Sequence, residues 1–403
     1  MKKAVIIAGV VFFVLIAYFT KSAIDFYRSI YQKNTGTISK PVVAKEKTEY
    51  NVLLMGYGGP GHDGPYLTDT MMVAHIDLKK NTIALISLPR DIWIKLPTKS
   101  KSDFHAKINS IYQLGLFPTD FPDVDTDNFR GADLMKKAVA DITGLVIDSY
   151  AAIDFTGFVR AIDIMGGVDV DVQKTFDDYE YPIESKENDL CGRDEEFMQV
   201  ERFLKPDFSE EEKQQLFKDK PELEVFFKSI KEKPLEAFPC RYEHLHFDAG
   251  LVHMDGATAL KYVRSRHSAQ DGNDFARGAR QQQFVKAVKG KAISLGIVTK
   301  IVPLLDELKN HIKTDISPDV MKKFISEAAD AGNYKINTVN ITDKDVLKSS
   351  YSSYGGYILI PRMGIDRWDG VHVEIKNKIL GITPTPSPLH KISPTAKTIR
   401  SQD

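Results

Sequence analysis

Short apolar runs alternate with amphipathic stretches along most of the chain. Runs at 51–55, 71–76 and 83–87 have the length of buried strands, and the first run leads into the glycine-rich segment 56–61. The polar residues Asp77 to Asn81 between the second and third runs predict a hairpin connection. The early part of the sheet is therefore expected to be partly antiparallel.

Helical periodicity returns further along the chain, between additional strands. Apolar residues three and four positions apart predict helices at 131–143, 155–165 and 274–295, and two more within 300–331. Further strands are expected at 168–172, where apolar and acidic residues alternate, and at 334–339 and 357–360. This interleaving predicts an α/β domain spanning 50–380, with a mixed central sheet flanked by helices.

One segment, 184–241, differs from the rest because it is rich in lysine and glutamate. Weak helical patterning runs through it, and Ser209 with Glu212 has the spacing of a capping box. We expect a helical insertion outside the main sheet. Cys191 and Cys240 lie in this segment and are consistent with one disulfide closing a loop of about fifty residues, or with two free buried thiols.

The two ends of the chain have a different character from the centre. Residues 4–20 carry no charge and follow Lys2 and Lys3, which predicts a short transmembrane signal anchor, with a cleaved signal peptide as the alternative. Residues 1–3 would then be cytoplasmic, 21–49 would form a tether, and the domain would face outward. The proline-, serine- and threonine-rich residues 381–403 predict a disordered tail.

Composition limits the classes of function. The chain has 403 residues, of which 42% are hydrophobic, and a formal net charge of −1. It can therefore bury a large core, and it lacks the overall positive charge that is typical of nucleic-acid binding. Any concentration of positive charge in this chain has to be local.

Such a concentration occurs in the second half of the chain, at Arg264, Arg266, Arg277 and Arg280 with Gln281. Guanidinium groups stay protonated and present a planar fork of donors that matches phosphate oxygens. In an extended segment Arg264 and Arg266 would face one way, and in a helix the other three would share one side. The cluster predicts a site for a multiply charged phosphate group, and solvated surface arginines are the alternative.

Other motifs precede the cluster: Asp69-Thr70 at the start of a strand, Ser87-Leu88-Pro89-Arg90-Asp91, and Lys107-Ile108-Asn109. In this order, from Tyr50 to about Leu295, the chain resembles the LytR-CpsA-Psr family. The resemblance implies a membrane-anchored enzyme that binds a glycan on polyprenyl pyrophosphate. Such an enzyme transfers the glycan as a phosphodiester to peptidoglycan and releases polyprenyl phosphate.

The resemblance also implies roles for individual residues. The pyrophosphate-binding positions of the family are Arg90, Arg264, Arg266, Arg277, Arg280 and Gln281 in this chain. Asp69 takes the position of the magnesium-binding aspartate, and we expect Asp69, Arg90, Arg264, Arg266 and Asp274 to form the catalytic set. This agrees with the chemistry, since phosphoryl transfer needs oxygen charges neutralised and the acceptor held in line, and hard oxygen ligands suit Mg²⁺.

Some positions depart from the family pattern. The segment Gly56-Tyr57-Gly58-Gly59 lacks a second metal carboxylate, and we expect Asp63 to substitute for it as a magnesium ligand. Leu67 stands where arginine is frequent, and His62 either replaces part of that charge or is a turn residue.

Two further roles stay open. Asp274 is either the base that takes the acceptor proton or a helix N-cap, whereas Asp91 is expected to orient Arg90. The apolar residues Phe155, Phe158, Val159, Ile162 and Ile164 fit a lipid cavity, although core packing is favoured for most of them.

Two other functions use the same residues. A polyprenyl-pyrophosphate hydrolase would use water in place of the glycan acceptor. A non-enzymatic lipid-binding or regulatory membrane protein would bind the lipid without turnover. The products separate the three hypotheses, because only the transferase joins the glycan to peptidoglycan.

Overall fold

The computed structural model describes residues 21, 24–25, 27–32, 47–205, 208–294, 307–328 and 331–382. Its centre is a six-stranded sheet of order β11-β6-β1-β2-β3-β12. The strands are β1 (Glu49–Tyr57), β2 (Thr68–Asp77), β3 (Thr82–Ser87), β6 (Ser149–Asp154), β11 (Ile312–Thr314) and β12 (Lys335–Asn340). β1, β2 and β3 are antiparallel, whereas β6 and β12 run parallel to β1 and β3. The predicted mixed sheet is confirmed.

The turn between β2 and β3 follows from its sequence. The Asp77 carboxylate accepts hydrogen bonds from the backbone N–H groups of Lys79 and Lys80, both at 3.0 Å. Aspartate favours turns because its side chain can bond the backbone two or three residues ahead. This turn brings the end of β3 back beside the middle of β2, where Met72 pairs with Ser87.

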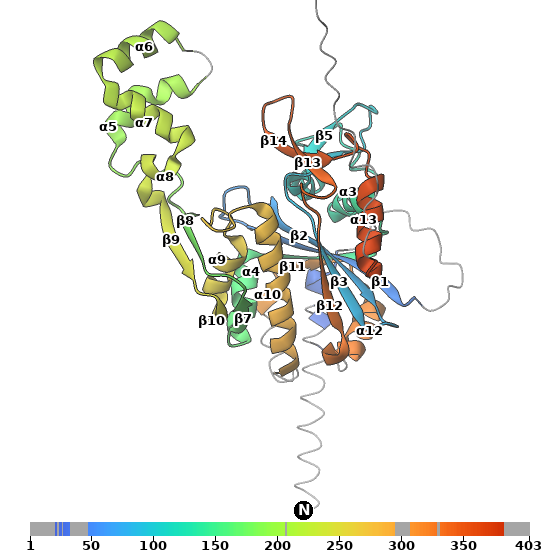
Figure 1. Ribbon diagram of the computed structural model, residues 1–403. Helices are drawn as coiled ribbons and strands as arrows, with labels where there is room; N and C mark the ends of the chain where they lie inside the picture. The colour runs from blue at the N-terminus through green and yellow to red at the C-terminus, as the bar shows by residue number, and fades with distance from the viewer. Residues whose placement is uncertain are drawn as a thin grey trace, which may run out of the picture.

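Helices cover both faces of the sheet (Figure 1). One face carries α2 (Ile111–Leu116), α3 (Ala132–Thr143) and α13 (Asp369–Leu380). The other face carries α4 (Phe155–Ile164), α9 (Gly256–Arg264) and α10 (Asp274–Ser294). The predicted helices at 131–143, 155–165 and 274–295 correspond to α3, α4 and α10.

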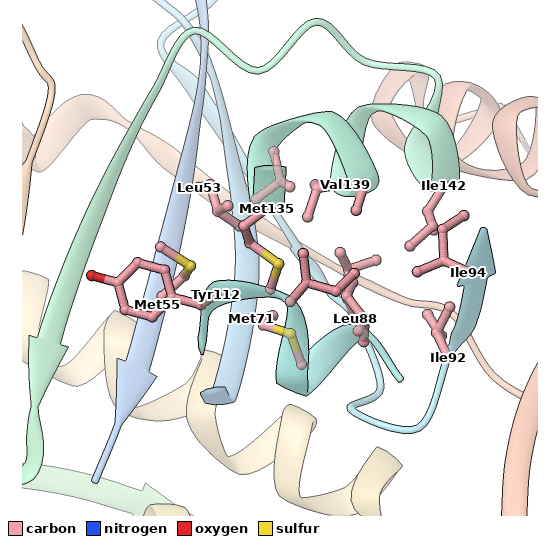
Figure 2. Close-up of a cluster of buried hydrophobic side chains, with 14 of the residues drawn as sticks. Leu53, Met55, Met71, Leu88, Ile92, Ile94, Tyr112, Met135, Val139 and Ile142 are labelled. Carbon is pink, nitrogen blue, oxygen red and sulfur yellow. The ribbon is translucent and has the colours of Figure 1, made fainter. Parts of the chain in front are cut away.

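The face under α3 is the densely packed core (Figure 2). Leu53 and Met55 point to this face because side chains alternate along a strand, and they meet Met135, Val139 and Ile142 on one side of α3. Each such side chain contributes about 1.5–3 kcal/mol when fully buried. This core holds the strands that carry the site residues in a fixed register.

On the other face, α10 is held close to the sheet. The Gln282 side chain donates to the carbonyl oxygens of Leu85 and Val339, at 3.0 and 3.1 Å. Gly278 permits the approach, because a Cβ at this position would lie 3.3 Å from the Ser87 Cβ. These contacts fix the first turns of α10 over the end of β3.

Two antiparallel ribbons lie outside the main sheet. β7 (Val168–Val172) pairs with β10 (Gly250–Met254), and β8 (Phe176–Pro182) pairs with β9 (Tyr242–Phe247). The strand expected at 168–172 is present and half-buried, with alternate residues exposed. The strand expected at 357–360 is also present, as β14 (Tyr357–Pro361), but it pairs with β13 (Leu347–Tyr351) and does not join the main sheet.

Residues 184–241 form a helical arm that projects from the β8–β9 ribbon (Figure 1). Its helices are α5 (Asp194–Val200), α6 (Glu210–Asp219), α7 (Pro221–Glu232) and α8 (Pro234–Ala237). The arm has its own small core around Leu223, Phe226 and Phe238. At the start of α6, the Ser209 hydroxyl accepts from the Glu212 N–H at 3.3 Å, which is one half of a capping box.

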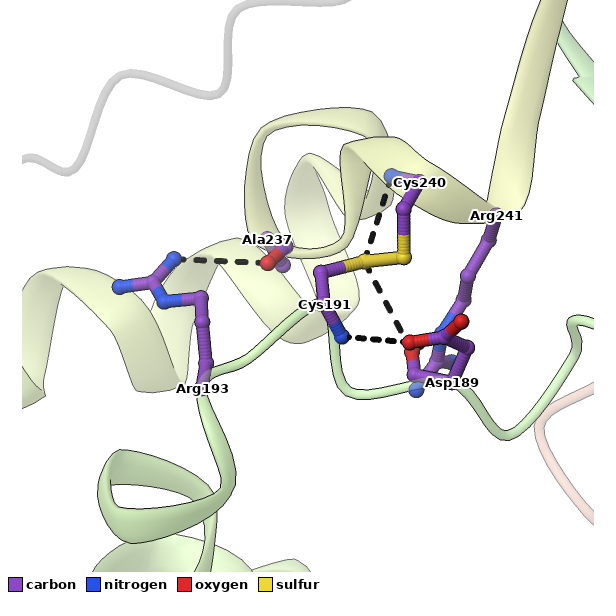
Figure 3. The surroundings of a disulfide bond; sticks show 6 residues. All are labelled: Asp189, Cys191, Arg193, Ala237, Cys240 and Arg241. Atoms are coloured by element: carbon purple, nitrogen blue, oxygen red, sulfur yellow. Dashed lines mark hydrogen bonds between the residues drawn. A yellow bond between two sulfur atoms is a disulfide. The ribbon is translucent and has the colours of Figure 1, made fainter.

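A disulfide joins Cys191 to Cys240 at the base of the arm, with the two Cα atoms 5.6 Å apart (Figure 3). The Arg241 guanidinium donates to the carbonyl oxygen of Asp189 at 2.6 Å beside this bond. The segment that enters the arm is therefore joined covalently to the segment that leaves it.

The chain ends lie largely outside the described residues, including the expected anchor at 4–20 and the tail after 382. Within the described residues, every helix is too short or too polar to span a bilayer. Part of the expected tether, 27–32, is described and contacts the domain, since the Gln32 N–H donates to the Thr314 carbonyl oxygen at 2.7 Å. Of the two helices expected within 300–331, α12 (Pro318–Ala328) is present and the other falls mainly on residues outside the described ranges.

Candidate active site

Asp69 and Arg90 meet because β2 and β3 are antiparallel neighbours. Asp69 lies near the start of β2 and Arg90 follows the end of β3, and Arg90 Nη1 is 3.2 Å from Asp69 Oδ1. Arg90 Nε is buried and makes no hydrogen bond within the described residues. A buried guanidinium N–H without a partner is costly, which indicates that a further acceptor belongs beside it.

Asp274 joins this pair from the first turn of α10. Asn273 caps the helix, because its Oδ1 accepts from the Ala276 N–H at 2.8 Å, so the N-cap alternative for Asp274 is wrong. The Asp274 carboxylate instead lies 3.1 Å from Arg277 Nη2 and 3.8 Å from Arg90 Nε. It is therefore a central carboxylate between two arginines.

Three arginines, Arg90, Arg266 and Arg277, lie close together at this point. Burial lowers the pKa of Arg277, whose side chain is 5% exposed, and the carboxylates of Asp274 and Asp69 oppose that shift. Burial also lowers the pKa of Arg266, and the charges of Arg90 and Arg277 lower it further, whereas the carboxylates of Asp274 and Asp69 oppose the shift. Arg266 forms no ion pair with any carboxylate in the described part of the chain. The arrangement is one that a polyanion would stabilise.

Arg264 and Arg266 do not lie on one strand, contrary to the expectation. The amphipathic pattern of α9 continues through Arg264, its last residue, and Arg266 lies in the loop that follows. The Arg264 guanidinium lies 4.3 Å from the Phe155 ring centroid, and its Nη1 donates to the Tyr181 hydroxyl at 3.3 Å. Both arginines nevertheless border the same cleft.

That cleft, which we call the arginine cleft, has a volume of about 400 Å³. Its charged lining comes from four arginines, Arg90, Arg264, Arg266 and Arg277, and from three acidic residues, Asp69, Asp178 and Glu180. Tyr242 and Pro234, at the two ends of the segment that returns from the arm to the ribbon, complete one wall. Four guanidinium groups around one cleft match the oxygens of a pyrophosphate.

A second, apolar cavity of about 280 Å³ adjoins the cleft, between the sheet and helices α4, α9 and α10. Its walls include Phe155, Phe158 and Phe284, while Gly56 and Ala151 on the sheet have side chains too small to fill it. Ile162 is 3% exposed within a packed cluster, as core packing predicts. Phe158 packs against the same cluster and Phe155 is buried, and both rings also line the cavity. Three residues border both spaces: Asp69, Arg264 and Arg277. The arginine cleft and the apolar cavity therefore share part of their lining.

Arg280 and Gln281 have other partners. Arg280 is buried, and its Nη1 lies 3.0 Å from Asp271 Oδ1 while its Nη2 donates to the Ser265 carbonyl oxygen. It lines neither the arginine cleft nor the apolar cavity. These contacts show that Arg280 holds the loop that carries Arg266. Gln281 borders the apolar cavity and donates to the Val263 carbonyl oxygen at 3.1 Å.

The structure gives no support for Asp63 as a metal ligand. Asp63 is exposed in its loop and borders neither the arginine cleft nor the apolar cavity. Its neighbour His62 packs edge-on against Phe155, and its Nδ1 lies 3.2 Å from Glu184 Oε1. His62 therefore contacts the base of the arm and supports the ring under Arg264.

Oxygen atoms that could hold a cation surround a space of about 10 Å³ beside the cleft. Asp69, Asp274 and Ser87 all border it, and the buried Ser87 Oγ makes no hydrogen bond within the described residues. A space of this size accommodates one water or one ion. Carboxylate and hydroxyl oxygens are the donors that Mg²⁺ prefers, so these residues fit that ion.

Three residues that support the site carried no assigned role in the sequence. Lys107 Nζ lies 2.5 Å from Asp91 Oδ1, and Asp91 also lies 3.8 Å from Arg90 Nε. Asp91 is therefore placed between two cations, as expected of a residue that orients Arg90.

The buried Asp178 accepts from the Ser265 hydroxyl at 2.7 Å and the His267 N–H at 3.2 Å. Tyr181 borders the cleft. Asp178 and Tyr181 lie more than eighty positions before the arginines they support, and only the fold brings them together.

Comparisons with known proteins agree with this geometry. Residues 13–359 match the model of the LytR_cpsA_psr family. The polyisoprenyl-teichoic acid–peptidoglycan teichoic acid transferase TagU of Oceanobacillus iheyensis is 25% identical over 298 residues, which cover 74% of this chain and 68% of TagU. The corresponding transferase TagV of Bacillus subtilis is 24% identical over 341 residues, 83% of this chain and 66% of TagV.

A solved structure supports the fold. The crystal structure of B. subtilis TagV has a TM-score of 0.51 and 22% sequence identity, and the match covers 84% of this chain and all of that one.

Proposed function

This chain belongs to the LytR-CpsA-Psr family, and we propose that it transfers a glycan phosphate from a polyprenyl-pyrophosphate-linked precursor to peptidoglycan, releasing polyprenyl phosphate. The observation that carries the proposal is the shared border of the arginine cleft and the apolar cavity at Asp69, Arg264 and Arg277. A polyprenyl pyrophosphate has the same division, with a charged head on an apolar chain. The names of TagU and TagV, which describe the transfer of teichoic acid to peptidoglycan, support the choice of acceptor.

The arginine cleft binds the pyrophosphate. Arg90, Arg264, Arg266 and Arg277 donate to its oxygens, and the head satisfies the buried Arg90 Nε. Entry of the anion replaces the ion pairs that now hold Arg90 and Arg277 to Asp274. Binding therefore releases this carboxylate.

In the transfer step, the acceptor hydroxyl oxygen attacks the glycan-side phosphorus. The bond from that phosphorus to the bridging oxygen breaks, and polyprenyl phosphate leaves with the bridging oxygen. The hydroxyl proton passes to Asp274, which borders the small space beside the cleft and lies against Arg90 and Arg277. The arginines stabilise the charge on the phosphoryl oxygens, which supplies most of the rate enhancement in reactions of this type.

Asp69, with the unpartnered Ser87 Oγ, would hold Mg²⁺ beside the head group. The ion, when bound, neutralises charge on the phosphate oxygens. Asp69→Asn is accordingly expected to lose Mg²⁺-dependent turnover while keeping lipid binding through the arginines.

The domain is proposed to work outside the cell, anchored by residues 4–20. The Cys191–Cys240 disulfide supports this location, because such bonds persist in oxidising compartments. An anchored domain also meets a lipid-linked precursor at the membrane surface, where that precursor resides.

Turnover of a polyprenyl-pyrophosphate glycan by the full chain with Mg²⁺, with and without a peptidoglycan acceptor, tests the proposal. Release of polyprenyl phosphate that depends on the acceptor is the expected result. Equal release without acceptor would favour a hydrolase, and tight binding without release would favour a lipid-binding protein. Arg160→Ala, an exposed arginine outside the site, is the matched control for arginine variants.

A further inference from the structure

The outer face of the β8–β9 ribbon carries a group of three potential metal ligands that the proposed reaction does not use. Asp177 on β8 faces His244 and His246 on β9, because residues two apart on a strand share one face. His244 Nε2 lies 2.9 Å and His246 Nδ1 lies 2.8 Å from the same oxygen, Asp177 Oδ1. Two ring nitrogens and one carboxylate oxygen therefore converge on one point.

Both imidazole rings are oriented by contacts outside this group. His246 Nε2 lies 3.3 Å from Asp248 Oδ1, and the ring of His244 stacks on Tyr179 with centroids 4.2 Å apart. A carboxylate on the far nitrogen of a histidine fixes its N–H there and leaves the other nitrogen as the ligand. The lone pair of His246 Nδ1 then faces a carboxylate oxygen, an arrangement that needs a proton or a metal cation between them.

Asp177 is also held in place. The Gln270 Nε2 donates to Asp177 Oδ2 at 3.0 Å, the Gln270 Oε1 accepts from the Asp177 N–H at 2.9 Å, and the Ala269 N–H donates to the Asp177 carbonyl oxygen at 2.8 Å. These bonds leave Oδ1 facing the histidines. They also connect the ribbon to the loop that follows Arg266.

Other metal-type clusters in the described residues are weaker candidates. Asp103, His105 and Asp366 include one histidine, whose ring stacks on Trp93. The cysteines beside Asp189 are joined in the disulfide.

We propose that Asp177, His244 and His246 form a Zn²⁺ site that joins the two strands of the β8–β9 ribbon next to the loop 265–271. Two imidazoles and a carboxylate are ligands for zinc and not for Mg²⁺, and water completes a tetrahedral shell. Zinc bonds of about 2.0–2.1 Å set ligand atoms about 3.3 Å apart, so the observed contacts need to open by only about half an ångström. Both histidine side chains are nearly half exposed and have room for this rotation.

The position of the site explains what the metal would do. Asp177 points outward, whereas the next residue, Asp178, points inward and holds Ser265 and His267 on either side of Arg266. Zinc on the outer face would therefore restrict the strand that supports the arginine-bearing loop on its inner face. This ion is distinct from the Mg²⁺ beside Asp69.

The test is Zn²⁺ titration of the untagged full chain in mild detergent by calorimetry, with Co²⁺ absorption to report coordination geometry. We expect one equivalent of Zn²⁺, tetrahedral Co²⁺ bands, and a raised Tm in its presence. His244→Asn and His246→Asn should each weaken Zn²⁺ binding by at least about 10–100-fold and abolish the rise in Tm.

His253→Asn is the matched control, because His253 forms a similar exposed pair with Asp169 at 2.7 Å but lacks a third ligand in the described residues. It should bind Zn²⁺ as the wild type does. Asp69→Asn should do so as well, which separates this site from the transfer reaction. Absence of Zn²⁺ binding at 100 µM, or equal affinity in folded His244→Asn and His246→Asn, would show that the cluster is only hydrogen-bonded and would overturn the proposal.

Discussion

The arginines of the cluster predicted from the sequence differ in what holds them. Arg266 has no carboxylate partner in the described residues and lies close enough to Arg90 and Arg277 for their charges to lower its pKa. Arg280 is bound on both sides, by Asp271 and by the Ser265 carbonyl oxygen. Arg266 is therefore expected to bind the ligand, whereas Arg280, fourteen positions later, is expected to stabilise the fold.

For Arg266→Ala, we expect a loss of about 10²–10³-fold in kcat/KM with unchanged or higher Tm. In the free protein the side chain is repelled by Arg90 and Arg277, which offsets its attraction to Asp274 and Asp69, and a bound anion adds attraction without this opposition. Pyrophosphate-lipid binding and thermal unfolding of the same samples measure both quantities. A folded variant that keeps wild-type affinity would exclude Arg266 from the site.

For Arg280→Ala, the expected result is a loss of about 2–3 kcal/mol in the free energy of unfolding, because Asp271 and a buried carbonyl oxygen lose their donor. Denaturant unfolding measures this, with Arg160→Ala expected to change stability by less than about 1 kcal/mol. Stability equal to the wild type, combined with lost pyrophosphate affinity, would return Arg280 to the binding set.

At the scale of elements, the two faces of the sheet are packed differently. The face under α3 is filled, whereas small residues on the other face leave the apolar cavity beneath α4, α9 and α10. Hydrophobic periodicity predicted the helices on both faces, since it reports which side of an element is buried. It does not distinguish a packed contact from a cavity wall, which is why Phe155 and Phe158 could not be assigned from sequence.

Filling the cavity should separate lipid binding from pyrophosphate binding. Ala151→Phe places a ring in the apolar cavity, and we expect at least about a tenfold weaker affinity for the polyprenyl substrate with an unchanged affinity for inorganic pyrophosphate. Competition binding with the two ligands measures the difference. Equal loss of both affinities would indicate that the substitution disturbs the cleft and not the lipid path.

The arm depends on its disulfide for local stability. Cys191→Ser with Cys240→Ser should lower the stability of residues 184–241 by about 4 kcal/mol, the chain-entropy value for a loop of about fifty residues. Limited proteolysis is expected to cleave the arm first and to leave the sheet intact. Protection of the arm equal to that of the wild type would show that its phenylalanine core is sufficient.

Across the whole molecule, local sequence predicted the strands and helices well, and the motif order predicted which segments meet. Helical spacing placed Arg280 beside Arg277, but it does not report the contacts with Asp271 and the Ser265 carbonyl oxygen that hold its guanidinium. Asp63 is exposed and borders neither space, since a loop position does not fix the direction of a side chain. Asp178 and Tyr181 gave no signal, since their contacts with Ser265 and Arg264 depend on the β8–β9 ribbon folding back over more than eighty residues. Contacts of that range depend on topology, which periodicity does not report.

The central claim is that the glycan leaves as a phosphate ester, and a labelled substrate tests it most directly. The polyprenyl-pyrophosphate glycan is prepared with ³²P in the glycan-side phosphate and incubated with the full chain, Mg²⁺ and peptidoglycan. The account predicts that the label becomes covalently attached to peptidoglycan and that unlabelled polyprenyl phosphate is released in equal amount. Label that stays with the lipid, or that appears only as free phosphorylated glycan in the presence of acceptor, would contradict it.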